Sequence, residues 1–308
     1  MQFSKPANSE FASFKPNVNV LEGRDVPSAT VNVVGGKMEI TGDNAANAVV
    51  IRDDGSGNVT ATVITGSTQV TRAASKINQI VVNTQGGDDS VSFQLTKNML
   101  TALDLDIDLG AGNDRAAIDL YRGLSGVPLD INLDGGAGYD SAQVQFGAIN
   151  NSNVHLKASL GQGSDTMNVV FFNGVSGTST VDANIAGASG ADRIDCNVMG
   201  KIDAGSTLNL HVANAMDAND RLVLRYRGEL DGNLHADIDG AAAGYGAQAR
   251  FALDAASNGT VSARVHDANG VHESSAQVVD HSAARVTILD RLERLLTESP
   301  GVKVTRNV

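Results

Sequence analysis

Apolar and polar residues alternate in six stretches of this chain, and the stretches recur at intervals of 25 to 28 residues. In the third stretch, for example, Ala142, Val144 and Phe146 alternate with Gln143 and Gln145. Alternation with a period of two predicts a β-strand that has one face in the core and the other in water. Because the alternation returns at a nearly constant interval, it predicts a repeat protein in which each repeat forms one coil.

Each alternating stretch follows a glycine-rich turn that ends in an acidic residue. The aligned acids are Asp89, Asp114, Asp140, Asp165, Asp192 and Asp220. A related turn upstream carries Asn47 at this position, and a weaker copy downstream places Ala247 there. Equal positions of successive coils lie about 5 Å apart, the spacing of neighbouring strands. The sequence therefore predicts a line of carboxylates along one edge of the protein.

A second strand precedes each turn and keeps its register from coil to coil. Its inward residues include Leu103 and Leu105 in one coil and Leu129 and Ile131 in the next. We therefore expect an all-β fold, a right-handed parallel β-solenoid, because parallel crossovers are nearly always right-handed. A coil of about 26 residues has room for these two strands and for a third, short one.

The periodic part of the sequence also defines the expected domain boundaries. We expect the solenoid to span residues 29–280, after a mobile N-terminal tail at residues 1–28. Leucines at helical spacing in DRLERLLTES predict a short capping helix within a C-terminal cap at residues 281–308. Atypical terminal repeats are expected because they cover the open ends of the stack.

The composition narrows the range of partners. Thirty-five acidic residues against 23 basic ones give a net charge of −12, which repels nucleic acids and anionic lipid and attracts cations. No run of 18 apolar residues is present, so we expect no membrane insertion. Cys196 is the only cysteine, and its inward strand position predicts a buried, structural thiol.

The turn G-x-G-x-D and the strand behind it resemble the hemolysin-type (RTX) calcium-binding repeat over roughly residues 85–225. In that family calcium lies between stacked turns, held by the Asp carboxylate and by backbone carbonyls that glycine leaves accessible. The family has two nine-residue repeats in each coil, whereas this chain has one turn in a longer coil. The resemblance implies calcium as a cofactor and the following ligand positions: Asp89, Gly110, Gly112, Asp114, Gly136, Gly138, Asp140, Gly161, Gly163, Asp165 and Asp192. Since Asp and Gly also form turns without any metal, the residues alone leave both roles open.

A second acidic group is expected on the outer face of the strand before the turn. It combines Asp104 and Asp106 with Asp130 and Asp134 of the next coil, and His155 and Lys157 follow in the same columns. This face is similar to the active face of β-helical pectate lyases and polygalacturonases. Carboxylates about 5 to 9 Å apart suit glycoside hydrolysis. The alternative is a solvated strand face, which the absence of Trp for sugar stacking favours.

The segment LEGRDVPS at residues 21–28 resembles the LE-x-R-x-x-P-S segment of planctomycete-type cell-surface repeat proteins. The resemblance implies an extracellular or cell-surface location, although the N-terminus shows no apolar region of a conventional signal peptide. We therefore expect a non-enzymatic, calcium-binding structural or adhesive module, with a surface or matrix polysaccharide or protein as its partner. The alternative is a calcium-dependent polysaccharide lyase or glycoside hydrolase of the β-helix type.

Overall fold

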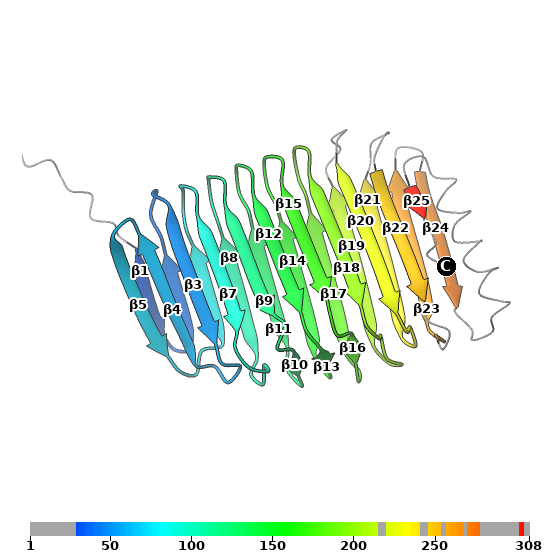
Figure 1. Ribbon diagram of the computed structural model, residues 1–308, viewed down its shortest axis with the longest axis horizontal. Helices are drawn as coiled ribbons and strands as arrows, with labels where there is room; N and C mark the ends of the chain where they lie inside the picture. Colours follow the sequence, from blue (N-terminus) through cyan, green and yellow to red (C-terminus); the bar gives the residue numbers. More distant parts are fainter. Residues whose placement is uncertain are drawn as a thin grey trace, which may run out of the picture.

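The chain folds into a stack of parallel β-coils, shown edge-on in Figure 1. The structure is a computed structural model that describes residues 29–214, 220–240, 246–253, 257–267, 270–277 and 302–304. The expected mobile tail at residues 1–28 and the expected capping helix lie outside these residues. The described residues contain strands, turns and bends but no helix, as the alternation predicts.

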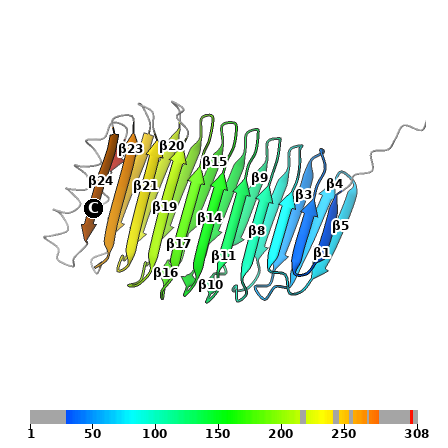
Figure 2. The ribbon, with the colours of Figure 1, turned by 180° about the vertical axis from the view of Figure 1, so that it is seen from behind.

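Two large sheets form the opposite walls of the stack, and they can be followed from both sides in Figures 1 and 2. The first wall contains, in spatial order, β1 (Thr30–Val34), β2 (Lys37–Thr41), β6 (Gln79–Asn83), β8 (Leu103–Asp108), β11 (Leu129–Asp134), β14 (Asn153–Ser159), β17 (Thr180–Ala186), β19 (Thr207–Asn214), β21 (Asn233–Gly240), β23 (Thr260–Asp267) and β24 (Gly270–Gln277).

The second wall carries the strands that follow the glycine-rich turns. Its spatial order is β25 (Val302–Val304), β22 (Gly246–Leu253), β20 (Arg221–Gly228), β18 (Arg193–Met199), β15 (Thr166–Phe171), β12 (Ser141–Phe146), β9 (Arg115–Leu120), β7 (Ser90–Leu95), β3 (Asn47–Asp53), β4 (Val59–Thr65) and β5 (Thr68–Ala74). A narrow third sheet closes the edge between the walls with β10 (Leu124–Ser125), β13 (Ile149–Asn150) and β16 (Val175–Ser176).

The register confirms the inward columns that the alternation predicts. Val91 pairs with Ala116, Ala116 with Ala142, and Ala142 with Met167, each in parallel strands and all buried. The two walls share one continuous aliphatic core, to which the buried Cys196 also belongs. Burial raises the pKa of the Cys196 thiol to about 12, which fits a structural role.

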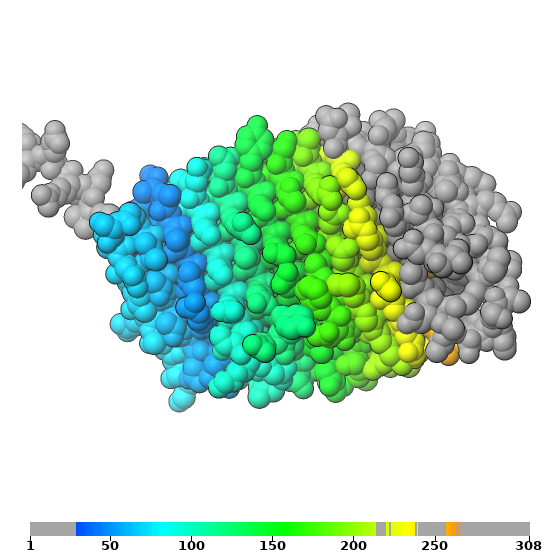
Figure 3. All heavy atoms as spheres, in the orientation of Figure 1, coloured from blue at the N-terminus to red at the C-terminus, as the bar shows by residue number. Residues whose placement is uncertain are grey.

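Aromatic side chains fill the core where two coils meet. The rings of Phe146 and Phe171 stack 4.8 Å apart and nearly parallel, because β12 and β15 place them directly over one another. In Figure 3 the sequence colours cross the molecular surface as ordered bands, since each coil adds one stripe to the face. Contacts are thus made mainly between neighbouring coils, as in other solenoids.

Antiparallel hairpins end the stack, which the repeat pattern did not predict. At the N-terminal end β1 pairs with β2, and β4 and β5 fold back against β3. At the other end β24 returns along β23. The prediction for Ala247 was wrong by two residues, because Ala247 lies opposite Leu222 and not beside Asp220. The two residues added in this coil shift the match.

The in-and-out assignment of β9 can be tested with two neighbouring substitutions. Ile118 is 1% exposed and faces the core, whereas the adjacent Ala117 is half-buried on the outer face. Ile118→Asp should unfold the array, because an unpaired buried charge costs several kcal/mol. Ala117→Asp should leave the melting temperature nearly unchanged. Equal melting temperatures for the two variants, measured by circular dichroism, would contradict the assignment.

Candidate functional site: a buried aspartate column

The glycine-rich turns place the aligned acids in one column at the edge of the second wall. Gly112 and Gly138 have φ of 152° and 143°, values in the region that favours glycine. A Cβ on Gly138 would lie 1.6 Å from the carbonyl oxygen of Gly112, so successive turns stack backbone on backbone. This close approach leaves room on the inner side, and the Asp side chains turn inward instead of into solvent.

The inward direction is the main feature that the sequence did not predict. Asp89, Asp114, Asp140, Asp165 and Asp192 are 1–4% exposed, and Asp220 is 9% exposed. The expected line of carboxylates is therefore confirmed as a line, but it lies beneath the surface. Among the described residues with printed partners, these side chains serve neighbouring coils.

A ladder of hydrogen bonds joins each column residue to the next coil. The Oδ1 atom of Asp140 accepts from the backbone N–H of Asp114 at 2.8 Å, and Oδ1 of Asp165 accepts from the N–H of Asp140 at 2.7 Å. The same bond recurs along the column with distances of 2.6–2.9 Å, from Asn47 N–H to Asp89 at one end to Asp192 N–H to Asp220 at the other. Each carboxyl thus replaces a backbone carbonyl as acceptor for a buried N–H.

The second carboxyl oxygen is in a different situation. The Oδ2 atoms of Asp89, Asp114, Asp140 and Asp165 are buried and have no hydrogen-bond partner. A buried oxygen without a donor costs free energy, more so when it carries charge. This cost is repeated in successive coils, so it has to be explained by the function or the protonation state of the column.

The surroundings of the column disfavour the charged form. Burial raises the pKa of Asp114 to about 6, while the bond from the Asp89 N–H offsets part of the effect and the charges of Asp89 and Asp88 add to it. Burial likewise raises the pKa of Asp140 to about 6, against the bond from the Asp114 N–H and together with the charges of Asp165, Asp114 and Asp134. The charged groups that act on these two carboxyls are themselves carboxylates.

The same for calcium: the column offers the hard oxygen atoms that calcium prefers, but not a complete shell. Calcium takes about six to eight oxygens. The carbonyls of Gly110 and Gly136, which could add to the carboxylates, accept ladder bonds from Ala137 and Gln162 at 2.9 and 2.8 Å. The described residues include no cluster of three or more His, Cys, Asp or Glu side chains suited to a metal ion. As arranged, these oxygens do not fit a calcium site, and calcium binding stays a prediction of the resemblance.

The second group of candidate residues lies on the outer face of the first wall, as predicted. The register places Asp104 beside Asp130 and Asp130 beside His155, and the side chains of all three line a hollow of about 310 Å³ with Lys157. Asp106 and Asp134 line a larger neighbouring groove of about 750 Å³, which runs across the strands from β6 to β19.

Most of the polar groups on this face are engaged with one another. Asp104 accepts from Gln79 at 3.0 Å, Asp106 accepts from Asn132 at 2.7 Å, and His155 faces Asp182 at 3.4 Å. Burial, then the charge of Asp106, raises the pKa of Asp104. The contacts follow the coil-to-coil columns, and no pair of carboxylates is set apart from the rest. The face can bind a polar chain or a cation, but its residues show no division into acid and base.

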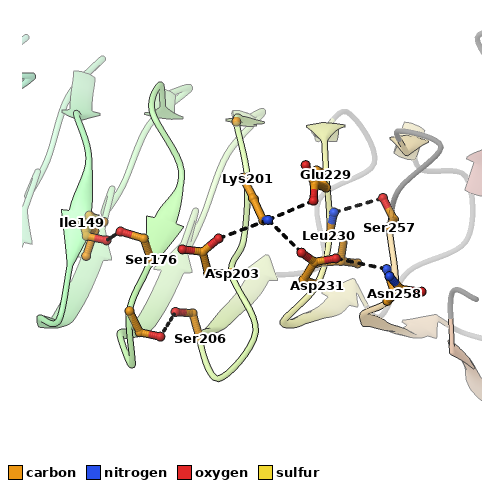
Figure 4. Close-up of polar contacts among 12 residues, drawn as sticks. Ile149, Ser176, Lys201, Asp203, Ser206, Glu229, Leu230, Asp231, Ser257 and Asn258 are labelled. Atoms are coloured by element: carbon orange, nitrogen blue, oxygen red, sulfur yellow. Dashed lines mark hydrogen bonds and ion pairs between the residues drawn. The ribbon is translucent and has the colours of Figure 1, made fainter. Parts of the chain in front are cut away.

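A further charged cluster lies on the third edge of the stack, and the sequence analysis missed it. Figure 4 shows Lys201 between three acids, with its Nζ atom 2.8 Å from Asp231, 2.9 Å from Glu229 and 3.5 Å from Asp203. The hydrogen bonds to Asp231 and Glu229 raise the pKa of Lys201. The signal was present, because Glu229 and Asp231 follow Lys201 by 28 and 30 residues, about one coil. The exposed cluster joins two coils and leaves excess negative charge.

No family model, curated protein or solved structure matches this chain. Among the described residues, no helix is long and apolar enough to cross a membrane. The site is therefore interpreted from its own geometry.

The raised pKa values predict how stability depends on pH. The folded-state pKa of about 6 for Asp114 and Asp140 lies above the ordinary value of 3.8, so their contribution to stability is complete below pH 3.8 and is lost as the pH rises through 6. Each carboxyl should cost up to about 3 kcal/mol at pH 7.5, at 1.36 kcal/mol for each pKa unit.

The measurement compares the free energy of unfolding at pH 5 and pH 7.5 in the parent protein and in Asp114→Asn/Asp140→Asn. The parent should gain more stability on acidification than the double variant does, since the variant lacks the two titrating groups. The difference between the two proteins isolates the column from other acids, such as Asp54 and Asp231, whose pKa values are lowered. An identical pH dependence in both proteins would contradict the prediction.

Proposed function

We propose that this protein is a non-enzymatic structural or adhesive module whose stacked coils form a rigid surface. The observation that carries the proposal is the distribution of acidic side chains. They recur once per coil, and in the column they are used for hydrogen bonds between coils. A catalytic site brings a few groups together at one place, usually in a concave pocket, and gives them different pKa values.

A location outside the cell or on its surface is the second part of the proposal. Its support is the resemblance of residues 21–28 to the segment that heads planctomycete-type surface proteins. The high proportion of strand and the acidic composition are compatible with a surface module that repels other polyanions. The partner would be a surface or matrix polysaccharide or protein that contacts the outer face of one wall.

Calcium is not needed for this proposal. The ladder bonds and the aliphatic core account for the contacts between coils within the described residues. The resemblance nevertheless predicts that calcium stabilises the folded array by mass action.

The rival function is polysaccharide cleavage on the outer face of the first wall. The two hollows lined by Asp104, Asp130, Asp134, His155 and Lys157 favour it. A lyase would need a base beside a bound cation, and a hydrolase would need an acid and a base or nucleophile on opposite sides of the bond. His155 faces Asp182, and the nearest carboxylates repeat along the wall.

Incubation with acidic and neutral polysaccharides distinguishes the two functions. The structural proposal predicts no new reducing ends or unsaturated products, with or without millimolar calcium, and labelling of intact cells by an antibody against the folded protein. Cleavage that Asp130→Asn or Lys157→Met abolishes while the variant keeps its melting temperature would replace the proposal by the enzymatic one. Exclusive labelling of permeabilised cells would contradict the surface location.

A further inference from the structure

Asn47 stands at the head of the column and shows what the second side-chain atom of a column residue contacts. Its Nδ2 atom donates to the carbonyl oxygens of Asp43 at 3.0 Å and Ala45 at 2.5 Å, both in its own turn. Its Oδ1 atom accepts from the hydroxyl of Thr65 in the neighbouring strand β4. The amide thus uses a donor toward its turn and an acceptor toward the N-terminal neighbour.

The Oδ2 atom of Asp140 occupies the place that Nδ2 of Asn47 occupies. Gly42 and Gly135 each stand five residues before the column residue of their coil. A methyl group on Gly42 would lie 2.9 Å from Nδ2 of Asn47, and one on Gly135 would lie 3.0 Å from Oδ2 of Asp140. The other oxygen of Asp140 points toward the N-terminal neighbour, as Oδ1 of Asn47 does.

The same atom position therefore meets opposite chemistry in the two coils. In the coil of Asn47 an N–H group points at two turn carbonyls. In the coil of Asp140 the equivalent carbonyls belong to Gly136 and Gly138, four and two residues before the acid. A carboxylate oxygen has no hydrogen to offer them, and Oδ2 of Asp140 is buried with no partner. Oxygen lone pairs facing one another repel.

We propose that the column requires a hydrogen-bond donor at this second position, which Asn47 supplies as an amide and the acids supply only as neutral carboxylic acids. The donor would bond to the carbonyls of the turn, as Nδ2 of Asn47 does. The column is then a row of proton-holding sites that replace the calcium sites of the RTX-like arrangement. No Lys, Arg or His stands among the charged groups that act on Asp114 and Asp140, and these groups are Asp88, Asp89, Asp134 and Asp165 together with each other.

Two reciprocal substitutions at neutral pH test the proposal. Asp140→Asn keeps the acceptor for the Asp114 N–H and adds the missing donor, so its melting temperature should rise by about 2 to 4 °C. Asn47→Asp removes the donor and should lower the melting temperature by a similar amount. Asp130→Asn, on the exposed outer face, is the matched control, because it removes the same negative charge without touching the column. All four proteins are melted in EDTA and again in millimolar calcium.

The expected result is a gain for Asp140→Asn beyond that of Asp130→Asn, a loss for Asn47→Asp, and no effect of calcium on the parent. Loss of stability in Asp140→Asn, together with a calcium-induced rise confined to the parent, would overturn the proposal in favour of a metal site. Melting temperatures of Asp140→Asn and Asn47→Asp that both match the parent would show that no donor is needed. Normal circular dichroism at low temperature establishes that each variant has folded.

Discussion

The solenoid depends on one recurring hydrogen bond, from the backbone N–H of a column residue to the carboxyl of the column residue one coil later. At this point the chain leaves a glycine-rich turn and enters a strand of the second wall. The next backbone N–H already points the other way, since Arg115 donates to the carbonyl of Asp89 in the preceding coil. Without the side-chain oxygen, the N–H of Asp89 would be buried and unpaired, at a cost of about 1–3 kcal/mol. One acid per coil prevents that cost throughout the array.

The glycines and the acids of the turn solve a single packing problem. The turns can stack at strand spacing only if no Cβ separates them, and a Cβ on Gly163 would overlap the carbonyl of Gly138. Once the turns touch, the side chain that follows is directed into the space beneath them. The carboxyl is therefore buried because the turns are tight, and its raised pKa is a consequence of the fold.

The sequence predicted the periodic part of this structure well, and the physical reason is register. Because an inward column must stay inward, the alternation around Ile118 and Val144 fixes both the face and the pairing of β9 and β12. The direction of the Asp side chains could not be predicted, since it depends on positive φ at glycines, which sequence permits but does not require. The hairpins at the ends could not be found from a repeat either. The shifted match at Ala247 shows that an inserted residue pair defeats alignment by period alone.

The ladder also gives the array a direction. Each carboxyl serves the coil before it, so a coil can be followed by another only if the newcomer brings an acceptor at the column position. The first column residue is exempt, because β4 runs antiparallel to β3 and presents the Thr65 hydroxyl instead of a column N–H. Asn47 can therefore use its side chain to close its own turn and to bind the capping hairpin. An amide at the start and acids in the coils that follow is the order that this asymmetry favours.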